Sequence, residues 1–147
     1  MENHDKALTY FKKYIELGGM STDAYLSIIN IYSGPKENKE EALKVVRQAR
    51  TKFPANQDLP KVEIGLLIDL KKIDEAKTGL EQQIKKEPDN KILHFYLGYV
   101  NQSLNNIADA KKNYEAALKI DPQYFEAQLY LSKLMYVDAA ATKKEMS

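Results

Sequence analysis

A fixed spacing of two residue types constrains the fold of this chain more than any other sequence feature. Alanine recurs at intervals of 34 residues, and proline recurs at the same interval, 12 residues after each alanine. The positions are Ala42, Ala76 and Ala110, and Pro54, Pro88 and Pro122. Such a period indicates stacked repeats, because each repeat can bury its apolar face only against its neighbours. We therefore expect an extended surface instead of a single globular core.

Each period has the pattern of two helices joined by a short turn. Residues 92–104 are apolar on more than one face, and residues 107–120 carry apolar side chains at three- and four-residue steps. Asn105 and Asn106 suit the turn between them, because Asn tolerates left-handed backbone geometry. Pro122 ends the second helix. The two preceding units follow the same plan, with Asp58 expected to cap a helix and Lys71 expected in a turn.

We predict about eight antiparallel helices in one repeat domain, residues 1–137. Full repeats span about residues 22–56, 57–90 and 91–124, and half repeats at 5–19 and 124–137 flank them. Ala7 lies 35 residues before Ala42, one more than the period, and a longer turn at residues 33–35 can absorb the difference. Residues 138–147 lack an apolar stripe, so we expect a flexible tail there.

Composition and charge exclude several classes of function. The chain has 44% hydrophobic and 29% charged residues, the balance of a folded domain. Its 22 basic and 21 acidic side chains nearly cancel, whereas nucleic-acid binders carry a basic excess, so we expect no nucleic-acid partner. No apolar run reaches the roughly 18 residues that span a bilayer, and the N-terminus does not resemble a signal peptide. We expect no membrane insertion.

The sequence gives little support to an active site or a metal centre. The chain has no cysteine, which excludes thiolate ligands, disulfides and cysteine nucleophiles. The two histidines, His4 and His94, are far apart and do not suggest a metal site. Acidic pairs such as Glu40 and Glu41 lie at the start of predicted helices, where they favour the helix dipole. We predict no enzymatic activity, no metal and no cofactor.

The residues that keep the period resemble the tetratricopeptide repeat, a helix-turn-helix of 34 residues with a Trp, Leu-Gly, Tyr, Ala, aromatic, Ala, Pro skeleton. The resemblance covers roughly residues 5 to 137. It departs from the skeleton where His94 replaces the tryptophan, Asn101 the tyrosine and Ile29 a glycine. The matching residues are Leu97, Gly98, Ala110, Tyr114, Ala117 and Pro122 in the third full unit, Ile64, Gly65, Ala76, Leu80 and Pro88 in the second, and Tyr25, Tyr32, Ala42, Val46, Ala49 and Pro54 in the first.

This resemblance implies a right-handed superhelix whose concave groove is lined by the first helix of each unit. It also implies that Gly65 and Gly98 allow the facing backbone to come near. Counting from the glycine positions gives candidate peptide-binding residues that are aromatic and apolar with a few polar groups, suited to an extended peptide or a partner helix. They are Leu26, Ser27, Asn30, Val62, Leu66, Phe95, Tyr99, Gln102, Leu129, Lys133 and Tyr136. The alternative is that several of them only pack against adjacent helices, Leu26, Val62 and Leu66 above all.

One subset of this family grips the C-terminal carboxylate of heat-shock chaperones with cationic side chains and two asparagines. Asn30 fits one of those positions. The remaining positions hold Leu26, Glu63, Ile92 and Tyr96, so the cationic grip is absent. The sequence therefore disfavours the binding of chaperone tails.

The sequence favours a non-enzymatic scaffold that binds an unidentified protein or peptide in the groove. One alternative is self-assembly into a homo-oligomer, because the half repeats at both ends present apolar faces. Another is a docking or regulatory segment of a larger protein or enzyme, because the chain opens in the middle of a repeat. The sequence does not fix the compartment: the cytoplasm is favoured if the chain is complete, and the periplasm is an option if it is an excerpt.

Overall fold

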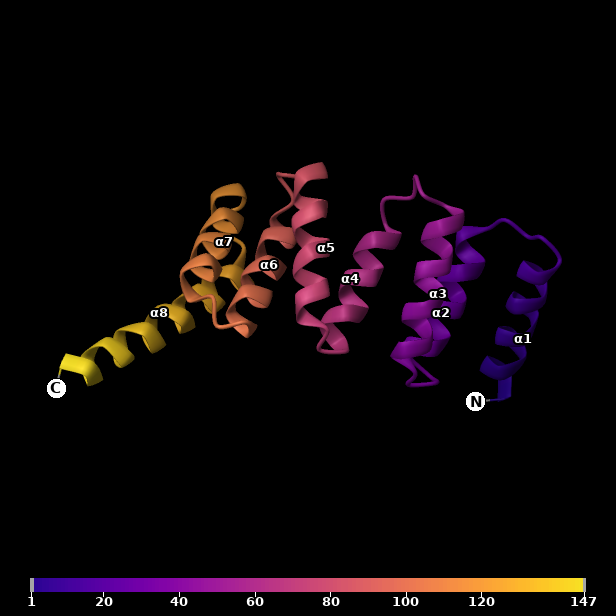
Figure 1. Ribbon diagram of the computed structural model, residues 1–147, viewed down its shortest axis with the longest axis horizontal. Coiled ribbons are helices and arrows are strands. Elements are labelled where there is room, and N and C mark those ends of the chain that lie inside the picture. Colours follow the sequence, from indigo (N-terminus) through magenta and orange to yellow (C-terminus); the bar gives the residue numbers. More distant parts are fainter. Residues whose placement is uncertain (1, 147) are drawn as a thin grey trace. The chain divides into compact units, whose positions relative to one another are not determined.

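The computed structural model describes residues 2–146, which form eight helices and no strand (Figure 1). The chain divides into two compact units, one up to Lys72 and one from Ile73 onward. Met1 and Ser147, the ends of the predicted domain and tail, lie outside the described residues. None of the described helices is both long and apolar enough to cross a membrane.

The first unit contains four helices that pack in chain order. They are α1 (Glu2–Glu16), α2 (Thr22–Ser33), α3 (Lys39–Lys52) and α4 (Leu59–Asp69). Contacts join α1 to α2, α2 to α3 and α3 to α4. The core is densest between α2 and α3, where Ile28 and Ile29 are buried together with Ala42, Val46 and Ala49. Each helix in this unit is thus stabilised by the next, as expected of a repeat array.

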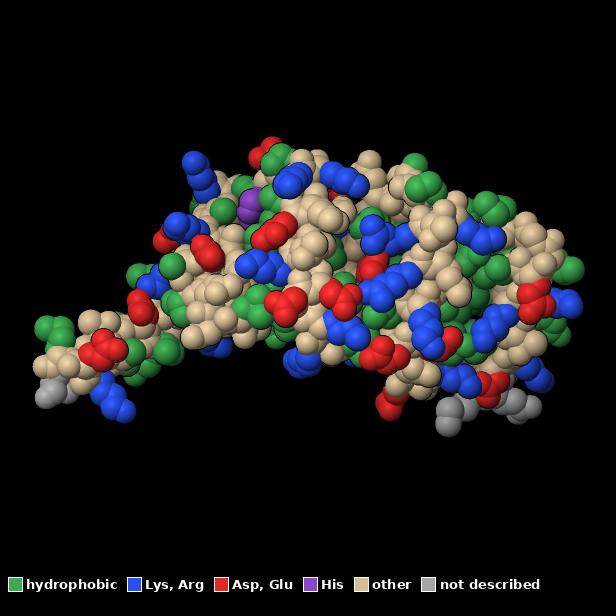
Figure 2. Space-filling view, viewed as in Figure 1, with side chains coloured by type: hydrophobic (Ala, Val, Ile, Leu, Met, Phe, Trp, Pro, Cys, Tyr) green, Lys and Arg blue, Asp and Glu red, His purple; other side chains and the backbone are tan. Residues whose placement is uncertain are grey.

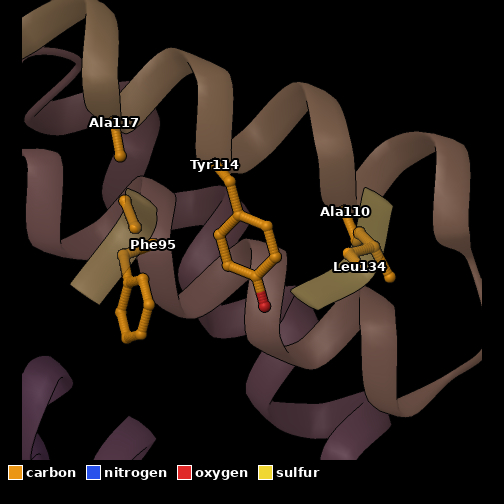
Figure 3. Packing of buried hydrophobic residues seen from close by; sticks show 6 residues of the cluster. Phe95, Ala110, Tyr114, Ala117 and Leu134 are labelled. Carbon is orange, nitrogen blue, oxygen red and sulfur yellow. The ribbon is translucent and has the colours of Figure 1, made fainter. Parts of the chain in front are cut away.

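The second unit contains α5 (Ile73–Lys86), α6 (Lys91–Ser103), α7 (Ile107–Ile120) and α8 (Phe125–Met146). Contacts again join helices that follow each other in the chain, and they are most extensive between α6 and α7. The core cluster draws on three helices, and Tyr114 of α7 lies in it between Phe95 on one side and Ala110 and Leu134 on the other (Figure 3). This cluster fixes α6, α7 and α8 against one another.

The periodic alanines are packing positions. Ala42, Ala76 and Ala110 all have 0% of their surface exposed, and each lies on the second helix of its repeat. A side chain limited to a methyl group lets the neighbouring helix approach closely at that point. The interval that is visible in the sequence therefore marks a repeated close contact.

A second feature shares the 34-residue interval. The turns between the two helices of each repeat contain one residue with a positive φ: Glu37 (49°), Lys71 (61°) and Asn105 (62°). At Lys71, backbone N–H groups of the turn donate back to the carbonyls of Leu67 and Ile68, and the turn at Asn105 repeats this pattern. The left-handed residue thus satisfies the last carbonyls of the first helix. The turn at Glu37 is longer, which agrees with the extra residue between Ala7 and Ala42.

Expectations about three individual residues are wrong. Asp58 precedes α4 but makes no capping hydrogen bond; Asn56 Oδ1 accepts from the N–H groups of Asp58 and Leu59 instead. Gly65 does not allow a close approach, since a Cβ placed there meets no atom within 4 Å. At Gly98 the close neighbour is the ring of Tyr114 and not a backbone, because a Cβ there would lie 2.6 Å from that ring.

The last helix is longer than the sequence pattern predicts. We expect a helix from Tyr124 to about Val137, but α8 continues to Met146. Its last third is rich in Ala, Lys and Glu, which have high helix propensity, and no Gly or Pro interrupts it. The apolar stripe therefore does not decide where this helix ends. The mobility of the segment stays a prediction.

Candidate functional site

In the second unit, α6 and α8 carry six of the candidate residues, and these divide by exposure. Leu129, Lys133 and Tyr136 follow each other on one face of α8 and are exposed, with Tyr136 76% exposed. Tyr99 and Gln102 of α6 are half-buried. Phe95 is 8% exposed and belongs to the core cluster, so its side chain mainly holds the helices together.

Tyr130 joins the two helices and was missed by counting from the glycine positions. Its ring contacts Phe95 edge-on with a centroid distance of 5.2 Å, Tyr99 at 6.2 Å and Tyr114 at 6.0 Å. Edge-to-face arrangements of this kind fix the relative orientation of aromatic rings. The 34-residue interval contains the signal that could have found it, because Tyr130 lies one period after Tyr96.

Polar groups lie close to these rings. The hydroxyl of Tyr114 donates to Oε1 of Gln102 at 2.7 Å, and the same Gln102 side chain carries an NH₂ group that can donate to a ligand. Burial raises the pKa of the Tyr114 phenol, with smaller contributions from Tyr130 and Tyr99, so this hydroxyl stays protonated and remains a donor. Lys133 Nζ lies 5.6 Å from the centre of the Tyr130 ring, a cation–π contact. The surface is aromatic, with one cation and one amide.

In the first unit the candidate residues lie on α2 and α4. Leu26 and Ser27 are half-buried and Asn30 is exposed on α2, whereas on α4 Val62 is half-buried and Leu66 is 6% exposed. Leu66 therefore contributes mainly to packing. The first unit presents fewer exposed apolar side chains among its candidates than the second unit does.

Glu63, next to Val62 on α4, forms an ion-pair cluster with two arginines of α3. Nε of Arg47 donates to one carboxylate oxygen at 2.8 Å, and Arg50 donates to the other. Burial of Glu63 by itself raises its pKa, but the hydrogen bonds and charges of Arg47 and Arg50 outweigh it, so the pKa of this carboxyl lies below its usual range. This carboxylate is already neutralised by its neighbours and joins α3 to α4.

Within residues 2–146 no group of three His, Cys, Asp or Glu side chains is placed to hold a metal ion. Nε2 of His94 lies 2.7 Å from the carbonyl oxygen of Pro88, so this histidine joins the start of α6 to the preceding loop. Its contact is a structural one.

Two open depressions lie away from the candidate residues. One, in the first unit, lies at the turn between α2 and α3, beside Leu70. The other, in the second unit, lies between Lys111 of α7 and the α8 residues Met135, Asp138, Ala139, Thr142, Lys143 and Met146. Neither is an enclosed cavity suited to a small molecule, because both are open to solvent along one side.

Comparison with known proteins agrees with this architecture. A family model described as tetratricopeptide repeat matches residues 92–124, which comprise most of α6, all of α7 and the turn into α8. No curated protein matches the chain. Residues 92–124 are therefore a tetratricopeptide repeat, which confirms the resemblance predicted from the sequence.

Solved structures share the fold over nearly the whole chain. MamA residues 41 to the end from Desulfovibrio magneticus RS-1 is 15% identical with a TM-score of 0.80, and the match covers 97% of this chain and 80% of that one. The first tetratricopeptide domain of Spaghetti (RPAP3), bound to the HSP90 peptide SRMEEVD, is 20% identical with a TM-score of 0.64 and 94% coverage of both chains. The second such domain of human RPAP3, in complex with an HSP70 peptide, is 21% identical with a TM-score of 0.66, covering 76% of this chain and 92% of that one. The chain thus has the all-α solenoid fold of tetratricopeptide-repeat proteins, a fold that serves in general as a non-enzymatic interaction scaffold.

Proposed function

We propose that this protein binds a peptide segment of another protein on the first helices of its second unit, α6 and α8. The observation that carries the proposal is the aromatic surface of the second unit. There Tyr99 and Tyr130 lie edge-on to each other, and Leu129 and Tyr136 extend the surface as exposed side chains. Tyrosine suits recognition, because its ring buries a large area while only two torsion angles become fixed.

The chemistry of the surface selects an uncharged, apolar or aromatic peptide. Lys133 is the only cation among the candidate residues, so long-range attraction of an acidic partner is weak. Gln102 can donate a hydrogen bond to a peptide carbonyl, and the rings of Tyr99 and Tyr136 can cover apolar side chains. We infer that affinity rests mainly on apolar contact and depends little on salt.

The partner differs in charge from the peptides in the RPAP3 structures. Both peptides end in the acidic sequence Glu-Glu-Val-Asp. The positions where a cationic grip would lie hold Ile92 and Tyr96 on α6, and Glu63, already paired with two arginines, on α4. We therefore expect such acidic tails to bind poorly to this chain.

A display library of random linear peptides, selected on the full chain, tests the proposal. The affinity of a selected peptide is measured by isothermal titration calorimetry for the wild type and for the double variant Tyr99→Ala, Tyr136→Ala. Loss of both rings should weaken binding by at least about tenfold, since buried tyrosines at interfaces commonly contribute about 2 kcal/mol or more.

The matched control is Tyr10→Ala, which removes an equally exposed tyrosine from α1. Circular dichroism should show the same helicity in all three proteins. Unchanged affinity in the double variant, with helicity retained, would place the binding surface elsewhere and contradict the proposal.

A further inference from the structure

The first helices of the second unit share one face that stays open even where helices pack on both sides. Helix α6 contacts both α5 and α7, yet Ile92 and Tyr96 are 48% and 41% exposed. One interval later, the same positions of α8 hold Glu126, which is exposed, and Tyr130, which is half-buried. The end of the chain therefore does not explain why this face is open.

Two tyrosines lie close together at the start of α8. Tyr96 of α6 and Tyr124 both lie edge-on against Phe95, with centroid distances of 5.4 and 5.5 Å. Tyr124 directly precedes α8, and Glu126 lies in the first turn of that helix. Burial raises the pKa of the Tyr124 phenol, and the charge of Glu126 and the nearby Tyr96 raise it further. The carboxylate of Glu126 thus lies within electrostatic reach of this pair of tyrosines.

One ring of the pair already holds a cation of the chain itself. Nζ of Lys91 lies 5.1 Å from the centre of the Tyr124 ring, and the same ammonium is paired with Asp121. The negative face of the ring attracts the ammonium, and the carboxylate neutralises it. Glu126, in contrast, forms no ion pair with any residue from 2 to 146. A carboxylate and an exposed ring thus occur here a second time, without a cation.

Charges of both signs are spread over the second unit. On the face seen in Figure 2, acidic and basic side chains are interspersed over α5 to α8 and do not form a broad patch of one sign. The net charge of the whole chain is +1. No general field therefore attracts one kind of partner, and the carboxylate of Glu126 acts mainly on a group in direct contact with it.

We propose that the peptide bound on α6 and α8 carries one basic side chain, Lys or Arg, which pairs with Glu126 and lies against the ring of Tyr96. This inference rests on the proposed function. The candidate residues select an uncharged apolar segment, and Glu126, which is not one of them, adds a charged residue at one end of that segment. The carboxylate supplies the opposite charge, and the ring supplies a cation–π contact.

Glu126 also gives the binding surface a direction. Glu126 and Lys133 lie seven residues apart on one face of α8, which is about 10 Å along the helix axis. An extended peptide covers that length with about three residues. The basic side chain therefore lies about three residues from the part of the peptide that contacts Lys133, and a peptide bound in the reverse direction would bring it to the lysine instead.

Parallel selections on the wild-type chain and on Glu126→Lys test the proposal. A display library of random linear peptides is selected on each protein. Peptides selected on the wild type should share apolar positions and have Lys or Arg at one fixed position. Peptides selected on Glu126→Lys should keep the apolar positions and have Asp or Glu at the fixed position, because only the charge of the subsite is reversed.

Isothermal titration calorimetry then compares one selected basic peptide with the same peptide in which Glu replaces the basic residue. Glu126→Gln should weaken binding of the basic peptide about two- to fivefold, the effect of one exposed ion pair. Glu126→Lys should weaken it further and strengthen binding of the acidic peptide. The matched control is Glu115→Lys, the same change of charge at an exposed position of α7, which should leave both affinities unchanged. Circular dichroism should show the same helicity in all variants.

The outcomes separate this inference from the proposed function. Peptides without a shared basic position, or with equal affinity for the wild type and Glu126→Lys, would overturn the inference alone if the double variant Tyr99→Ala, Tyr136→Ala still weakens their binding. A basic peptide that depends on Glu126 but not on those two tyrosines would contradict the proposed tyrosine surface and leave the basic subsite in place. Failure to select any peptide on the wild type would overturn both.

Discussion

Two glycines in the first helices of consecutive repeats have opposite surroundings. A Cβ at Gly98 would meet the Tyr114 ring at 2.6 Å, and this ring cannot move away easily because it is buried and its hydroxyl is bonded to Gln102. A Cβ at Gly65 would meet nothing within 4 Å, and Gly65 is exposed in the middle of α4. The close packing at Gly98 thus requires glycine. Gly65 lies one interval before Tyr99, at a different position of the repeat, where glycine is only tolerated.

Alanine substitution should therefore have opposite effects at the two positions. Gly65→Ala should raise the free energy of unfolding by about 0.5–1 kcal/mol, because alanine loses less backbone entropy in a helix. Gly98→Ala should lower it by about 1–3 kcal/mol through overpacking against Tyr114. Urea unfolding followed by circular dichroism measures both, and each variant is the control for the other. A gain in stability for Gly98→Ala would show that the ring is free to shift.

Neighbouring elements in the first unit are joined by charge as well as by apolar packing. Glu63 on α4 has a side chain that is 9% exposed and receives hydrogen bonds from Arg47 and Arg50 on α3, whose side chains are 48% and 43% exposed. Because water still reaches the arginines, the cost of burial falls mainly on the carboxylate. The hydrogen bonds offset that cost and keep the carboxylate charged.

This pair predicts a specific dependence of stability on pH. The pKa of Glu63 is lower in the folded chain than the usual value of 4.5, so its contribution is complete above pH 4.5 and is lost as pH falls through the folded-state pKa. Glu63→Gln should lower the free energy of unfolding at pH 7 by about 1.5–3 kcal/mol, the range for hydrogen bonds to charged groups.

The difference between wild type and Glu63→Gln should shrink as the solution is acidified below pH 4.5. Urea unfolding measured from pH 7 downward follows it, and Glu81→Gln, at an exposed position of α5, is the control. A loss of stability that is the same at every pH would mean that the charge of Glu63 contributes nothing and that only its shape is needed.

At the scale of the whole molecule, stability comes from consecutive helices, so the amount of buried side chain differs strongly along each unit. In the first unit α2 has six buried residues, whereas only Leu8 of the described residues of α1 is buried. In the second unit α6 also has six, whereas the longer α8 has only Ala127 and Leu134. In an array of this kind, a helix with a smaller interface to its neighbours opens locally at a lower free energy, and therefore more often.

Hydrogen exchange followed by mass spectrometry should reveal this gradient. In dilute solution the amides of α1 should exchange at least about tenfold faster than those of α2, and those of α8 at least about tenfold faster than those of α6. A tenfold difference in exchange rate is a lower bound. Burying one large apolar side chain fewer already lowers the free energy of local opening by about 1.5–3 kcal/mol. Equal protection of α1 and α2, or of α8 and α6, at low protein concentration would contradict this account.

Much of the architecture could be predicted because the repeat is specified locally. The turn residues and the apolar spacing of residues 92–104 and 107–120 are features of a single repeat, and the alanines recur at the length of one repeat. The helices observed there agree with these features. The candidate surface was less predictable. Phe95 and Tyr99 lie four residues apart on α6, and Val62 and Leu66 lie four residues apart on α4. In each pair one side chain is buried, Phe95 or Leu66, and the other is half-buried. The reason is that burial depends on the neighbouring helix and not on the helix's own sequence.

By itself, the sequence determined the helix pairs, their repeat interval and the small residues at their close contacts, since these depend on backbone preferences and on side-chain size at fixed spacing. The tertiary structure alone decided two further features. It paired Glu63 with two arginines of another helix and brought Tyr130 against Tyr99. These features depend on which residues meet across helices, because hydrogen bonds and ring contacts require partners that are distant along the chain.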